Sequence, residues 1–243
     1  MNYNNQYSPG PFAGLPVVTK NIIIINVLFY LLTVALQSTQ NFDLTKYLGL
    51  HYPTAPDFKP HQFITYIFMH GGFSHILFNM LGVYIFGQVL EQVWGPKRYL
   101  IFYILTGLGA ALAQYIIMHF EITEVLDIFN QHINSRNLDT SQRAEFINQK
   151  YEYLNKHVII GASGSLFGLL GGFGMLFPNR ELYLYFFIPI KAKWLVILYG
   201  GFEIFSGLQN NPTDNVAHFA HIGGLLVGIA LVLFWRKDRN HFY

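Results

Sequence analysis

Long apolar stretches constrain the fold of this chain more than any other feature. Six of them are spread over 243 residues, and only 12% of the residues are charged. A soluble domain carries about 25% charged residues, so half that share indicates that lipid is the main solvent. A helix can cross a bilayer because it satisfies its own backbone hydrogen bonds, and it needs about 20 apolar residues to do so. The expected fold class is therefore an all-α polytopic membrane protein with six transmembrane helices.

The expected spans are separated by segments rich in proline or in polar residues. The six spans are 17–36, 62–91, 99–118, 157–177, 182–208 and 216–235. The second span is expected to break at Gly71-Gly72, and the membrane part of the fifth to begin near Trp194. The domain is expected to cover 17–236, with short cytoplasmic tails at 1–16 and 237–243 and an extramembrane helical insert at about 121–156.

The distribution of basic residues predicts the orientation. With the N-terminus inside, nine Lys and Arg residues lie on the inner side and six on the outer side, four of these six in the insert. The positive-inside rule then favours both termini in the cytoplasm. We see no signal peptide and no appended targeting segment, which favours a prokaryotic plasma membrane. The lack of cysteine excludes disulfides and thiolate metal sites, and the net charge of +2 gives no sign of nucleic-acid binding.

Ser163 stands among small residues at the start of an apolar helix that stops before Pro178. At about 1.5 Å per residue, this helix rises roughly 21 Å, whereas the hydrocarbon core is about 30 Å thick. A helix that ends at one membrane face therefore leaves Ser163 inside the other face, which is the outer one in the predicted orientation. A hydroxyl at that depth is either a packing residue or the centre of a buried, hydrated reaction site.

Several other polar side chains lie inside the expected spans, where they are costly and usually face a cavity or another helix. They are His70, His75, Asn79, Glu91, Glu203, His218 and His221. His75 and Asn79 share one helix face. Gly224 and Gly228 follow His221 at the spacing that lets two helices approach closely, and the glycine-rich segment 161–174 is the expected partner. This packing would bring His221 against Ser163.

A serine and a histidine in contact indicate nucleophilic catalysis. Histidine has a pKa of about 6.5 and can take the serine proton. The Ser163 N–H at the positive end of its helix, with the side chains of His75 and Asn79, could stabilise an oxyanion. Because no Asp or Glu stands near Ser163 or His221 in the sequence, we infer a Ser-His dyad rather than a triad.

Three motifs in this order resemble the rhomboid family of intramembrane serine proteases. They are His75-x-x-x-Asn79, Gly161-Ala162-Ser163-Gly164 and Ala220-His221-x-x-Gly224-x-x-x-Gly228, on the second, fourth and sixth expected spans. The resemblance covers about residues 17–236 and implies a six-transmembrane-helix rhomboid-like bundle. The Trp-Arg pair that many rhomboids carry in the first loop is missing, and the insert is longer than expected.

The resemblance also implies roles. Ser163 would be the nucleophile, His221 the general base, and His75, Asn79 and the Ser163 amide the oxyanion site. The residues expected to line or support the cavity are His70, His218, Phe167, Gly161, Gly164, Gly224 and Gly228. Phe167 occupies a position that is often a tyrosine stacked on the base. The substrate would be a single-span membrane protein cut in or near its transmembrane segment, entering past the fifth span and the 209–215 turn, with no cofactor.

The same residues allow other interpretations. Ser163 alone would be read as a packing residue, and His75 and Asn79 as interhelical contacts worth about 1 kcal/mol each. A zinc site of His75, His218 and His221 is disfavoured because the sequence has no HExxH motif, so no metal is expected. Glu91 is expected to support the basic loop that follows it, and Glu203 receives no catalytic role.

Two rival functions differ from proteolysis. One is a catalytically inactive rhomboid-like protein that binds or escorts membrane proteins. The other is a transporter that uses Glu203 and the histidines as a proton relay, although the inverted repeats typical of transporters are not evident.

Overall fold

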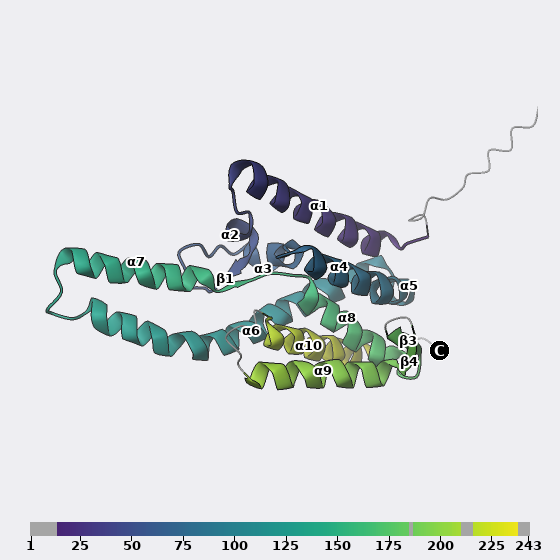
Figure 1. Cartoon of the computed structure of the whole chain (residues 1–243). Coiled ribbons are helices and arrows are strands. Elements are labelled where there is room, and N and C mark those ends of the chain that lie inside the picture. The colour runs from purple at the N-terminus through teal and green to yellow at the C-terminus, as the bar shows by residue number, and fades with distance from the viewer. Residues whose placement is uncertain (1–13, 185–186, 210–215, 238–243) are drawn as a thin grey trace, which may run out of the picture.

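The computed structural model describes residues 14–184, 187–209 and 216–237. Most of the two expected tails and most of the 209–215 turn therefore lie outside the described residues. The elements in chain order are α1 (Val17–Gln40), α2 (Thr45–Leu48), β1 (Leu50–His51), α3 (Gln62–Thr65), η1 (Tyr66–Phe68), α4 (Phe73–Gly82), η2 (Val83–Gly87), α5 (Gln88–Trp94), α6 (Pro96–Ile133), α7 (Thr140–Lys156), β2 (Val158–Ile159), α8 (Ser163–Leu176), β3 (Glu181–Leu184), β4 (Ile188–Lys191), α9 (Ala192–Gln209) and α10 (His218–Lys237). Figure 1 shows the helices gathered in one bundle, from which α6 and α7 project.

The expected all-α membrane fold class is confirmed, since most of the described chain is helical and much of it is apolar. Within the described residues, four helical segments are long and apolar enough to cross a membrane, judged by length and composition. They are Val17–Gln40, Phe73–Trp94, Pro96–Ile133 and His218–Arg236. Helix α8 is apolar but has 14 residues, and α9 has 18 with Glu203 among them. The count of six spans therefore stays a prediction.

Helix α8 lies at the centre of the bundle and packs against α6, α9 and α10. Its glycines remove the side chains that would hold these helices apart. A Cβ on Gly224 of α10 would run into the carbonyl oxygen of Gly164, and a Cβ on Gly228 would lie 2.5 Å from the carbonyl oxygen of Gly168. The backbones of α8 and α10 are therefore in direct contact, as small residues at four-residue spacing allow.

The segment before α8 is held in place by the chain between α1 and α4. Strand β1 pairs antiparallel with β2, so Leu50 lies opposite Ile159. Two residues later, the Gly161 N–H donates to the carbonyl oxygen of Tyr66 at 2.9 Å. The chain that leads into Ser163 is thus hydrogen-bonded first to β1 and then to the start of η1. The expected break at Gly71-Gly72 follows η1, and α4 begins at Phe73.

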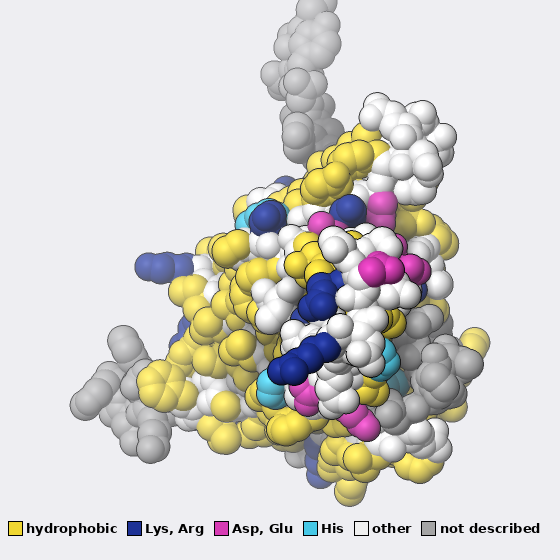
Figure 2. Space-filling view, turned by 90° about the vertical axis from the view of Figure 1, so that its left-hand side faces the viewer, with side chains coloured by type: hydrophobic (Ala, Val, Ile, Leu, Met, Phe, Trp, Pro, Cys, Tyr) yellow, Lys and Arg dark blue, Asp and Glu magenta, His cyan; other side chains and the backbone are white. Residues whose placement is uncertain are grey.

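The expected insert at 121–156 is a helical hairpin whose first part continues α6 without a break. Helix α6 has 38 residues, which makes it about 57 Å long and longer than a bilayer core requires. Arg143 of α7 donates to the carbonyl oxygen of Ile133 at 2.7 Å, and Lys150 donates to Asn130 Oδ1 at 2.7 Å. Figure 2 shows charged side chains gathered on this projecting end, with hydrophobic side chains around them.

Two local expectations were wrong. Residues 182–191 were expected in the fifth span, but residues 182–184 belong to β3 and residues 188–191 to β4, which pair antiparallel. Helix α9 begins at Ala192, close to the expected membrane start. Glu91 was expected to support the basic loop that follows it. Its carboxylate instead accepts hydrogen bonds from Val18 N (2.9 Å), Thr19 N (2.7 Å) and Thr19 Oγ1 (2.8 Å). It therefore caps the first turn of α1, where a negative charge is favourable.

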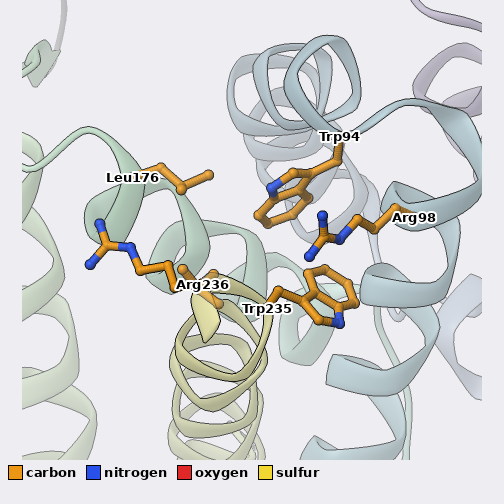
Figure 3. A pocket seen from close by; sticks show the side chains of 6 residues that line it. Trp94, Arg98, Leu176, Trp235 and Arg236 are labelled. Atoms are coloured by element: carbon orange, nitrogen blue, oxygen red, sulfur yellow. The ribbon is translucent and has the colours of Figure 1, made fainter. Parts of the chain in front are cut away.

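Tryptophan and arginine side chains gather at the end of the bundle where α8 stops (Figure 3). The guanidinium carbon of Arg98 lies 4.2 Å from the ring centroid of Trp235, and Trp94 meets Trp235 edge-on at 5.5 Å. Arg236 donates to the carbonyl oxygen of Met175 at 2.9 Å. Such residues favour the membrane–water interface, which agrees with the predicted cytoplasmic end of the bundle.

Candidate active site

The structure brings Ser163 and His221 into contact, although 57 residues separate them in the chain. Ser163 is the first residue of α8, and His221 lies in the first turn of α10. Ser163 Oγ lies 2.8 Å from His221 Nε2, which is hydrogen-bond distance. The hydroxyl donates to Nε2 when the neutral imidazole carries its proton on Nδ1. This is the arrangement in which an imidazole can act as a base toward a serine.

Phe167 fixes the plane of the His221 ring. It lies one turn after Ser163 on α8 and stacks on His221 with ring centroids 4.4 Å apart and planes 5° apart. Both side chains are buried, with 8% and 9% of their surface exposed. The imidazole is thereby held on one face by Phe167, while its edge meets Ser163.

Gly161 keeps open a small space between Ser163 and His75. A Cβ on this glycine would lie 2.7 Å from His75 Nε2 and 3.6 Å from Ser163 Oγ. Gly161 also has φ +120°, a conformation that residues with a side chain rarely adopt. The His75 ring from α4 and the Ser163 hydroxyl therefore border the same space, which only a glycine leaves free.

The other expected oxyanion residue also lies nearby. Asn79, one turn after His75, donates from Nδ2 to the His75 carbonyl oxygen at 3.0 Å, which leaves its second amide hydrogen for another acceptor. His70 packs behind His75 with ring centroids 5.0 Å apart, and it is 3% exposed. His70 thus supports the His75 ring, while Gly164, Gly224 and Gly228 act in the helix contact beneath the site.

These groups border a cavity of about 920 Å³. Its walls include Ser163, His221, His75 and Asn79, and it extends to Lys156 at the base of the insert. Histidine, asparagine and serine side chains along the wall give water hydrogen-bonding partners. The cavity therefore places several polar side chains beside Ser163, on a wall that is otherwise mostly apolar.

The sequence interpretation missed the position of Glu203. This residue of α9 is 6% exposed, and its Oε2 lies 2.6 Å from His218 Nδ1 and 2.9 Å from His221 Nδ1. The two histidines and Glu203 lie on neighbouring helices that pack against each other. One sequence feature could have indicated this contact. Glu203 is an acidic residue inside an apolar helix, and such residues usually have a specific partner.

A family model described as the Rhomboid domain matches residues 57–238. The chain belongs to the rhomboid family. This match includes α4, α8 and α10, which supply all four residues that the sequence singled out for catalysis. Helix α1 precedes the matched residues.

The individual relatives share 29% or less of their aligned residues with this chain. The chain is 29% identical over 184 residues to RHOMBOID-like protein 12, mitochondrial, of Arabidopsis thaliana, covering 75% of this chain and 48% of the relative. It is 27% identical over 183 residues to the putative rhomboid protease YdcA of Bacillus subtilis, covering 74% and 70%. It is 23% identical over 217 residues to the rhomboid protease GluP of Bacillus subtilis, covering 88% and 34%. The chain thus spans about half the length of the plant relative and a third of GluP.

Proposed function

We propose that this rhomboid protein is an intramembrane serine endopeptidase that cleaves single-span membrane proteins in or near their transmembrane segment. The observation that carries the proposal is the 2.8 Å separation of Ser163 Oγ and His221 Nε2. Two of the relatives are named as rhomboid proteases, one of them as putative, which supports this class of reaction.

Ser163 would act as the nucleophile. Its Oγ attacks the carbonyl carbon of the scissile peptide bond while its proton passes to His221 Nε2. The C–N bond then breaks, and His221 returns the proton to the leaving amine. A water molecule that enters the cavity would hydrolyse the acyl-enzyme in the same way, which restores the Ser163 hydroxyl.

Negative charge on the carbonyl oxygen would be stabilised from two directions. The Ser163 N–H belongs to the first turn of α8, where backbone donors lack partners within the helix and the helix dipole is positive. The His75 ring borders the space beside Gly161 together with Ser163 Oγ, and Asn79 lines the same cavity. Donors fixed in advance around a developing charge are a large source of catalysis.

A substrate helix would enter from the lipid between α4 and α9. The cavity wall includes Phe78 of α4 and Gly207 of α9, and Phe78 is 68% exposed on the outside of the bundle. This route agrees with the gate expected at the fifth span. The chain is an integral membrane protein, and the placement of the cavity toward the outer face is proposed from the distribution of Lys and Arg. The relatives come from plant mitochondria and from a bacterium, so they do not support the prokaryotic plasma membrane over another membrane.

A cleavage assay tests the proposal. Purified protein in vesicles is incubated with a model single-span substrate, and the products are identified by mass spectrometry. The wild-type protein should cut the substrate, and Ser163→Ala should not. Ser165→Ala is a matched control, because Ser165 lies on the same helix but donates to the Tyr103 carbonyl oxygen at 2.8 Å, away from His221. Unchanged cleavage by Ser163→Ala would reject the mechanism, and absence of cleavage by folded wild-type protein would favour a binding or escort function.

A further inference from the structure

The carboxylate of Glu203 lies behind the imidazole of His221, on the side away from Ser163. His221 Nε2 contacts Ser163 Oγ at 2.8 Å, and His221 Nδ1 lies 2.9 Å from Glu203 Oε2. The three groups therefore form a row that runs from α8 through α10 to α9. Glu203 is also almost fully buried, so the carboxylate has few alternatives to these partners.

We propose that Glu203 is a positioning residue that completes a Ser-His-Glu arrangement in this chain. The inference rests on the proposed protease function, and it replaces the expected dyad. Glu203 would hold the His221 tautomer with the proton on Nδ1, so that Nε2 is free to accept the Ser163 proton. When that proton arrives, the carboxylate would stabilise the imidazolium while remaining ionised itself.

His218 gives the carboxylate a second donor. Its Nδ1 lies 2.6 Å from Glu203 Oε2, a short, charge-assisted hydrogen bond. A buried carboxylate needs such partners to remain ionised in apolar surroundings. His218 and His221 lie one turn apart on α10, so both reach the same oxygen of Glu203. His218 therefore holds the carboxylate at the place where His221 meets it.

The contact with His221 is close but not fully aligned. Among the residues that the structure describes, His221 Nδ1 has no hydrogen bond of good geometry, although Glu203 Oε2 is 2.9 Å away. Catalytic hydrogen bonds are often poorly aligned without substrate and tighten in the complex. A small rotation of the imidazole, within its stack on Phe167, would direct the Nδ1 proton toward Oε2.

The same three side chains also have the chemistry of a metal site, since their donor atoms lie within 4.8 Å of one another. The distances favour the hydrogen-bonded arrangement. Two ligand atoms on one tetrahedral zinc ion lie about 3.3 Å apart, because each is about 2.0 Å from the metal. The 2.6 and 2.9 Å separations to Glu203 Oε2 are shorter and match hydrogen bonds.

The test separates the charge of Glu203 from its role as a link between α9 and α10. Glu203→Gln keeps the size and can still form hydrogen bonds, but it removes the charge. Glu203→Asp keeps the charge on a shorter side chain. Glu181→Gln is the matched control, since it makes the same change on the exposed strand β3. Each variant is measured for kcat and KM on a single-span substrate, and for its thermal unfolding midpoint.

We expect Glu203→Gln to lower kcat by about 100-fold or more with KM unchanged, as loss of the carboxylate in other triads implies. Glu203→Asp should recover at least tenfold of this loss, and Glu181→Gln should behave like the wild type. A Glu203→Gln variant that unfolds like the wild type and keeps its kcat would overturn the inference while leaving the proposed function intact. A folded wild-type protein that does not cleave would overturn both.

Discussion

Ser163 Oγ lies 2.8 Å from His221 Nε2 because the backbones of their two helices touch beside this pair, at Gly164 and Gly224. Gly164, directly after Ser163, and Gly224, about one turn after His221, have no side chains to separate α8 from α10. The position of the imidazole therefore depends on a helix contact as much as on the imidazole itself. This relationship explains why glycines accompany both candidate catalytic residues in the sequence.

Substitution of Gly224 by alanine should separate the two helices. The added Cβ would collide with the Gly164 carbonyl oxygen, and overpacking of this kind costs about 1–3 kcal/mol. We expect a lower unfolding midpoint and at least a tenfold loss of cleavage, measured on the same preparation. Gly201→Ala on α9 is the control, because a Cβ there would meet nothing within 4 Å. Equal activity of the two variants would show that the helix contact does not set the Ser163–His221 distance.

Substitution of Gly161 by alanine should block the space in front of the serine. A methyl group would press on His75 Nε2, and φ +120° is strained for alanine by about 1–3 kcal/mol. Cleavage should fall below detection while the protein still folds and inserts. Gly72→Ala is a suitable comparison, since Gly72 has extended backbone and open space at its Cβ position. Full activity of Gly161→Ala would contradict the proposed oxyanion site.

Removal of the Glu91 carboxylate should destabilise the docking of α1. Glu91→Ala leaves the backbone N–H groups of Val18 and Thr19 without their acceptor, at a cost of about 2 kcal/mol. Thermal unfolding in detergent should show a lower midpoint, while Glu152→Ala on the exposed face of α7 should match the wild type. An unchanged midpoint for Glu91→Ala would mean that the α1 cap contributes little to the fold.

The tip of the α6–α7 hairpin should loosen at acid pH. Hydrogen bonds from the Gln142 backbone N–H and from Ser141 lower the pKa of Asp139 below its ordinary value. A carboxylate with a lowered pKa stabilises the fold above its unfolded pKa of about 3.9, and this contribution is lost as pH falls through the folded pKa. Hydrogen exchange at Ser141 and Gln142, corrected for the intrinsic rate, should therefore speed up below about pH 4. Asp139→Asn, a neutral cap, should remove this pH step, and a step that persists would exclude Asp139 as its cause.

The sequence singled out most of the side chains that lie beside Ser163, because their signals are local and chemically unusual. Histidine and asparagine inside apolar spans, and glycines at four-residue spacing beside His221, each indicate a helix contact or a cavity. Their convergence on Ser163 was therefore predictable from three short motifs. The helical insert was equally predictable from its helical pattern of apolar residues, whereas its continuity with α6 was not.

The missed features depend on contacts between distant elements. Glu203 and His221 are 18 residues apart on different helices, and sequence proximity gave no indication that the glutamate would face the imidazole. Glu91 meets α1 across more than 70 residues. The β3–β4 hairpin was misread because a short apolar run can be helix or strand, and periodicity alone does not distinguish them. Packing, rather than local propensity, determines all three.

Covalent labelling with a fluorophosphonate probe tests the central claim most directly, because it requires an activated serine and no knowledge of the substrate. Peptide mass spectrometry of the labelled wild-type protein should find the adduct on Ser163. Ser163→Ala should lose the adduct, His221→Ala should label at least tenfold more slowly, and Ser165→Ala should label like the wild type. A folded wild-type protein without an adduct, or an adduct that forms equally fast without His221, would contradict the account.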